Sequence, residues 1–155
     1  MAQPSSSNPC AHSTVVARFE TFEVRAAYGM FYIRQPHALT TETHRIFLDW
    51  LNSMGPEACA TPTIHDMRGS AFDDVGTEVV KAWVHLSSRN RNRQTTPRAM
   101  IVGSEAAYGT MRMFQNLSDA RSVIDPSKLF VTYSLADGIR WLRPHRKRGS
   151  AALVT

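Results

Sequence analysis

The sequence predicts an α/β domain with a mixed, largely parallel sheet covered by helices. Short apolar segments alternate with segments whose apolar residues recur at helical spacing, and Ser, Thr or Asp stands where each helical segment begins. The resulting order is β-β-α-β-α-β-α-β-α. After an opening pair of strands, this alternation is typical of parallel strands joined by crossover helices.

The strand predictions depend on composition and on turn residues. Residues 15–22 and 30–35 are rich in β-branched and aromatic side chains, and the segment EVRAAYG between them is short enough for a hairpin-like connection. Residues 63–67, 98–102 and 128–133 are short and apolar, as strands are where helices cover a sheet.

The helix predictions depend on caps and apolar spacing. The expected N-caps are Thr40 or Thr41, Asp74, Ser104 and Ser134. Gly55-Pro56 should end the first helix. The apolar stripes that should face the sheet are Ile46, Phe47, Trp50, Leu51 and Met54; Val79, Val80, Trp83, Val84 and Leu86; Ala107, Met111, Phe114 and Leu117; and Leu135, Ile139 and Leu142.

The chain of 155 residues fits one domain. We expect a disordered leader at residues 1–13, a folded domain at 14–143 and a basic flexible tail at 144–155. The sequence has neither a secretory signal nor an apolar stretch of the ~20 residues that span a bilayer, so a soluble, cytoplasmic protein is expected.

The net charge of +5 is concentrated in two basic runs. The first comprises Arg89, Arg91 and Arg93, and the second extends from Arg143 to Arg148. Neither run is interleaved with the aromatic side chains that single-strand binders use. We therefore interpret them as a solvated helix end and a flexible tail, with no specific nucleic-acid partner.

No metal or cofactor is expected. Cys10 and Cys59 have no Cys or His neighbour at metal-ligand spacing, and the histidines are dispersed. The chain also lacks a Walker-type loop and a Gly-rich dinucleotide fingerprint.

A first candidate site follows the strand at residues 63–67, because open α/β sheets place ligands at the carboxyl ends of strands. Its residues could form a partner or ligand surface, an acid/base site, or only a polar loop that caps a helix. His65 and Asp66 would point to opposite faces if the strand persists. The candidate residues are His65, Asp66, Arg68, Ser70, Asp73, Asp74 and Thr77.

A second candidate site is an apolar pocket. Methionine side chains adapt to hydrophobic ligands, although the same residues also suit an ordinary core. The residues concerned are Met100, Tyr108, Met111 and Phe114.

Three segments resemble the STAS/SpoIIAA-like superfamily, in particular its bacterial SpoIIAA-like, STAS/SEC14-like branch. TIHDMRG at 63–69 is similar to a strand-to-loop segment in which an Asp closes a buried strand. PRAMIVGSEAAYGTMRMFQNL at 97–117 resembles the branch's strand-helix segment, and KLFVTYSLADGIRWL at 128–142 resembles its closing strand and helix.

The resemblance implies a SpoIIAA-like fold and a non-catalytic regulatory module that acts through a protein partner, which includes a second copy of the chain. It also implies, as an alternative, a carrier or sensor of a small hydrophobic ligand or lipid. A second alternative is an enzyme that uses the loop from Asp66 to Asp74. The family's antagonists carry a phosphorylatable Ser where this chain has Asp74, so Asp74 is either a helix cap or a fixed negative charge.

Overall fold

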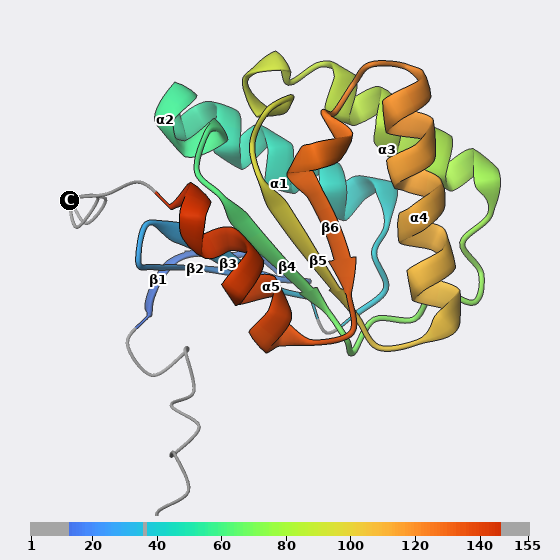
Figure 1. Ribbon diagram of the computed structural model, residues 1–155, viewed down its shortest axis with the longest axis horizontal. Coiled ribbons are helices and arrows are strands. Elements are labelled where there is room, and N and C mark those ends of the chain that lie inside the picture. Colours follow the sequence, from blue (N-terminus) through green and yellow to red (C-terminus); the bar gives the residue numbers. More distant parts are fainter. Residues whose placement is uncertain (1–12, 36, 147–155) are drawn as a thin grey trace, which may run out of the picture.

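The computed structural model describes residues 13–35 and 37–146 (Figure 1). Apart from Ser13, the predicted leader lies outside the described residues, and so does the predicted tail beyond residue 146. The first tail residues continue as a 3-10 turn, Arg143–His145, whose His145 ring lies 5.4 Å from the ring of Trp141. That part of the predicted tail therefore packs on the last helix.

The described residues form a six-stranded sheet whose strands follow one another in chain order. The strands are β1 (Thr14–Arg18), β2 (Glu23–Ala27), β3 (Met30–Arg34), β4 (Thr63–Met67), β5 (Arg98–Val102) and β6 (Leu129–Thr132). The pairs β1–β2 and β2–β3 are antiparallel, whereas β3–β4, β4–β5 and β5–β6 are parallel. The predicted α/β class with a mixed, largely parallel sheet is confirmed.

The opening of the chain differs from the prediction. The expected strand at 15–22 ends at Arg18, and the segment expected to connect two strands forms β2. Tyr28 and Gly29 both have positive φ, 52° and 73°, and Ala27 pairs with Met30 across them. A two-residue loop with both φ angles positive matches the twist of a hairpin, so the connection is far shorter than EVRAAYG suggested.

The helices cover the two faces of the sheet unequally. Helices α1 (Thr41–Met54), α3 (Thr77–Ser88) and α4 (Glu105–Ala120) pack on one face, where two clusters of buried apolar residues lie. Helix α5 (Leu135–Leu142) packs on β4, β5 and β6 from the other side and buries Leu142 against Ile64, Ala99 and Ile101. In Figure 1, α5 crosses in front of the sheet and α1 lies behind it.

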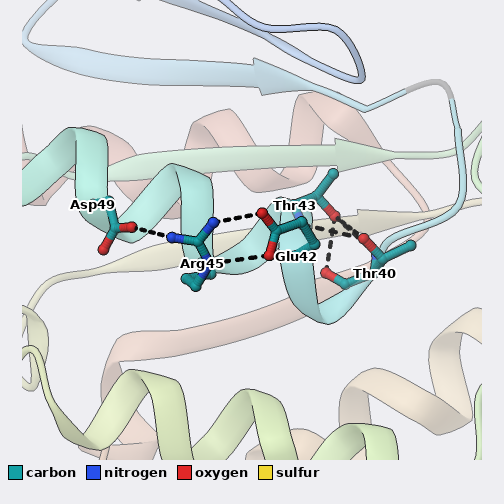
Figure 2. Close-up of polar contacts among 5 residues, drawn as sticks. All are labelled: Thr40, Glu42, Thr43, Arg45 and Asp49. Carbon is teal, nitrogen blue, oxygen red and sulfur yellow. Dashed lines mark hydrogen bonds and ion pairs between the residues drawn. The ribbon is translucent and has the colours of Figure 1, made fainter.

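Three of the predicted caps are confirmed. The hydroxyls of Ser104 and Ser134 accept hydrogen bonds from the backbone N–H groups of Ala107 and Asp137. Thr40 caps α1, and the Thr43 hydroxyl completes a capping box with it. Figure 2 shows this start of α1, where Arg45 also bridges Glu42 and Asp49. Helix α1 ends at Met54 with Gly55 as its C-cap, and Pro56 opens the short helix α2 (Pro56–Cys59).

The predicted cap at Asp74 is wrong. Helix α3 begins at Thr77, its N-cap is Gly76, and no side chain caps it. Buried Phe72 anchors a turn in which the N–H of Val75 donates to the carbonyl of Phe72. That turn places Asp73 and Asp74 outside the helix, where both are exposed.

None of the helices in the described part of the chain is long and apolar enough to cross a membrane.

We predict that Gly103→Ala destabilises the protein, whereas Gly109→Ala does not. A Cβ atom at Gly103 would lie 2.3 Å from the carbonyl oxygen of Arg68, so the loops after β4 and β5 would have to separate. Such overpacking costs about 1–3 kcal/mol. At Gly109, within α4, a Cβ atom meets nothing within 4 Å. Alanine there should stabilise the helix by roughly 0.5–1 kcal/mol. Urea denaturation of both variants measures the difference, and equal stabilities would contradict the close approach of the two loops.

Candidate functional site

A cavity of about 40 Å³ lies between the sheet and the layer formed by α1, α3 and α4. Its lining comes from β3, β4 and β5, from the three helices, and from the segments that flank β2 and β3. Most of the lining is apolar, but it also contains two imidazoles, an amide, a hydroxyl and an indole. The lining residues are Phe22, Ile33, Gln35, Leu39, Thr43, His44, Phe47, His65, Met67, Trp83, Met100, Met111 and Phe114.

The four residues of the predicted apolar pocket separate into two groups. Met100, Met111 and Phe114 are buried and line the cavity. Tyr108 lies outside the lining and stacks on Tyr133 with a distance of 5.2 Å between the ring centroids. Tyr133 is half exposed, so this stacked pair belongs to the surface near the N-terminus of α4.

The sheet separates His65 from Asp66. His65 lies on the face of β4 that carries the cavity, where its ring is nearly perpendicular to the Phe47 ring with 5.3 Å between the centroids. Asp66 lies on the other face and accepts hydrogen bonds from Tyr32 and from the Arg68 guanidinium, the latter at 2.8 and 2.9 Å. The alternation of the strand therefore excludes a direct His65–Asp66 pair.

Asp66 is a buried carboxylate tied to neighbouring segments. Burial raises the pKa of its carboxyl, but the hydrogen bonds from Arg68 and Tyr32 lower it by more, so the pKa lies below its ordinary value. The Ser70 hydroxyl donates to the backbone carbonyl of Gln35, which joins the loops after β3 and β4. These contacts fix the carboxyl edge of the sheet.

The remaining residues of the predicted loop site lie at the surface. Asp73, Asp74 and Thr77 are exposed, and Thr77 is the first residue of α3. None of them lines the cavity. The predicted set thus divides between the cavity, the opposite face of the sheet and the exposed start of a helix.

His44 is a cavity residue that the sequence did not indicate. Its Nε2 atom lies 3.1 Å from the Ser87 hydroxyl on α3. Burial, followed by the charges of Arg98 and Arg93, lowers the pKa of His44 to about 3. Burial and the same two charges hold the pKa of His65 well below its ordinary value. Both imidazoles are therefore neutral at physiological pH.

The interpretation of Arg93 as part of a solvated helix end is wrong. Arg89 and Arg91 are exposed, but the Arg93 side chain is buried. Its guanidinium donates to the carbonyl of Cys59 at 3.2 Å and lies over the Phe47 ring, 5.5 Å from the centroid. Arg98 on β5 is also buried and donates to the carbonyl of Arg93. Alternating Arg and Asn residues look solvated in a sequence because burial of Arg is rare.

The cavity combines a mostly apolar lining with a few polar groups. Among residues 13–35 and 37–146, no group of three His, Cys, Asp or Glu side chains is arranged to hold a metal ion. A mostly apolar cavity with a few convergent polar groups is typical of a ligand site.

We predict that the protein loses stability as the pH falls below about 6.5, because the unfolded histidines then bind protons that the folded ones exclude. The folded pKa of His44 is about 3 and that of His65 is also lowered. As the pH falls from the unfolded to the folded pKa of each histidine, that histidine should lower the free energy of unfolding by roughly 1 kcal/mol per pH unit. Urea denaturation at a series of pH values measures this slope.

His44→Gln should reduce the slope, and substitution of the exposed His85 by Gln is the matched control. A His44→Gln variant with the slope of the parent protein would contradict the assignment.

No protein-family model matches this chain, and neither a curated protein nor a solved structure does. The resemblance to the STAS/SpoIIAA-like superfamily therefore stays a prediction that depends on the segments 63–69, 97–117 and 128–142.

Proposed function

We propose that this protein is a non-catalytic, STAS/SpoIIAA-like module that binds a small ligand in the cavity and acts as its sensor or carrier. The observation that supports this proposal best is the Trp83 indole. Trp83 lines the cavity, and its buried Nε1–H has no hydrogen-bond partner among the described residues. A buried N–H group without a partner is costly, and a ligand with an acceptor atom would satisfy it.

The volume of the cavity limits the size of the ligand. A site for one water molecule needs roughly 10–15 Å³ on this scale, so about 40 Å³ accommodates a molecule of a few non-hydrogen atoms. This volume favours a small ligand over the lipid that the resemblance suggested. The separation of His65 from Asp66 by the sheet likewise favours binding over acid/base catalysis by the Asp66–Asp74 loop.

We predict that Met111→Phe abolishes ligand binding and that Met113→Phe does not. Both residues lie on α4, but only Met111 lines the cavity, so only its enlargement fills the binding volume. The measurement is the indole ¹H–¹⁵N spectrum during titration with a library of small fragments. The chain has 3 tryptophans, so the Trp83 signal is identified by removing the other two with Trp50→Phe and Trp141→Phe.

A fragment that shifts the Trp83 signal in the parent and in Met113→Phe, but not in Met111→Phe, would support the proposal. Absence of any shift across the library, or shifts unaffected by Met111→Phe, would contradict it.

A second candidate function is binding of a protein partner, and the stack of the half-exposed Tyr133 on the partly buried Tyr108 favours it. Tyrosine is enriched in protein interfaces because it combines a large apolar ring with a polar tip. The pair lies near the exposed start of α4, whose N-cap is Ser104. A partner at this surface, including a second copy of the chain, would leave the cavity free.

We predict that a photo-crosslinking residue at position 133 captures one specific partner in cells, whereas the same residue at position 54 does not. Met54, at the end of α1, is 49% exposed and Tyr133 is 51% exposed, so the two positions are matched in accessibility. Equal capture at positions 54 and 133 would indicate random encounters with other proteins and would contradict a specific binding surface at Tyr133. Sedimentation of the purified crosslinked product distinguishes a second copy of the chain from another protein.

A further inference from the structure

Two buried arginines lie beside the cavity, and neither has an acidic partner within the described part of the chain. Arg93 is 1% exposed and Arg98 is 4% exposed. Among residues 13–35 and 37–146, the ion pairs involve other arginines and a lysine. The two guanidinium groups donate to neutral oxygens of Cys59, Thr63 and Arg93, and the Nε atom of each has no partner in the described ranges. Burial of a charge without a counter-charge is costly, and an anion nearby offsets that cost.

The two arginines adjoin the cavity through its lining. Arg93 lies over the ring of Phe47, a lining residue. Arg98 precedes Met100 by two positions on β5, so both belong to the same face of the sheet, and Met100 lines the cavity. After burial, the charges of these arginines are the main causes that lower the pKa of His44 and of His65. The positive field therefore extends into the cavity.

The lining adds hydrogen-bond donors to this positive field and offers no counter-charge. Among the described residues that line the cavity, none is Asp or Glu. The His44 ring already contacts the Ser87 hydroxyl and a backbone group of Trp83. A neutral His65 imidazole can donate one N–H group, and the Trp83 indole N–H has no partner among the described residues. Hydrogen bonds from such donors to an ionised acceptor are stronger than those to a neutral one. The rest of the lining, which includes Ile33, Met67 and Phe114, is apolar and suits carbon atoms.

We propose that the cavity binds a small organic carboxylate, with its charge in the field of Arg93 and Arg98 and its short hydrocarbon part against the apolar lining. This inference rests on the proposed ligand-binding function and adds the chemical class of the ligand. The small volume restricts the class to short-chain acids of the size of acetate or propionate. A strongly hydrated inorganic anion suits the apolar lining less well, because it would have to lose its water there.

The experiment titrates the full chain with sodium propionate and, separately, with propionamide, which has nearly the same shape and no charge. Sodium chloride at equal concentration controls for ionic strength. The readouts are the Trp83 indole signal and the melting temperature. Propionate should bind at least about tenfold more tightly than propionamide, a difference that follows from one charged interaction. Chloride should produce neither a saturable shift of the indole signal nor the same rise in melting temperature.

The titrations test the proposed ligand binding and the proposed class of ligand separately. If neither propionate nor propionamide shifts the Trp83 signal, cavity binding itself fails and the proposed function fails with it. If propionamide binds as tightly as propionate, or chloride as tightly as either, the cavity still binds small molecules but the class of organic carboxylates is wrong.

Arg98→Met removes one charge at similar length and should bring the affinities for propionate and propionamide close together. Met111→Phe should block both probes, because it fills the volume that they share. If Arg98→Met does not fold, the comparison of the two probes on the unmodified chain decides the question by itself. A folded Arg98→Met variant could keep the full preference for propionate over propionamide. That result would show that the charge of Arg98 does not cause the preference.

Discussion

The burial of Arg93 is the constraint on which the interior of the helical layer depends. Its guanidinium donates to the carbonyl of Cys59 at the end of α2 and to the Thr63 hydroxyl on β4. Its own carbonyl accepts from Arg98 on β5. One residue thus fixes the segment after α3 against α2 and two central strands. The same contacts hold a charge close to the cavity, so the stability of this layer and the chemistry of the site are linked.

Much of the fold follows from local patterns. Runs of β-branched and apolar residues identified β3, β4, β5 and β6, and the hydroxyls of Ser104 and Ser134 identified two helix starts, because these signals act within a few residues. Strand β2 was missed because Arg25 and the small Ala26 and Ala27 give it no clear alternation. Asp74 was assigned wrongly because the long-range burial of Phe72 determines where the turn before α3 lies.

The candidate site was less accessible to sequence reasoning. Alternation along β4 correctly placed His65 and Asp66 on opposite faces. His44 and Arg93 gave no local signal, since their roles depend on segments that meet only after the helices pack on the sheet. A basic residue in a polar run is exposed in most proteins, so the sequence alone favoured the wrong environment for Arg93. The sequence does contain one signal for buried charge, which is Arg98. It is a charged residue within an otherwise apolar strand.

The order of the strands has a consequence for how the chain folds. Each of the six strands in the described part of the chain pairs with the strands before and after it in the sequence, so none of these six has to be inserted between two others. The hairpins of β1, β2 and β3 close over short loops, and each later strand adds to an edge that already exists. The hairpin contacts form quickly because their short loops lose little entropy, whereas each parallel pair forms across a longer helical crossover. The sheet can therefore grow in one direction during synthesis, with β6 and α5 completing it last.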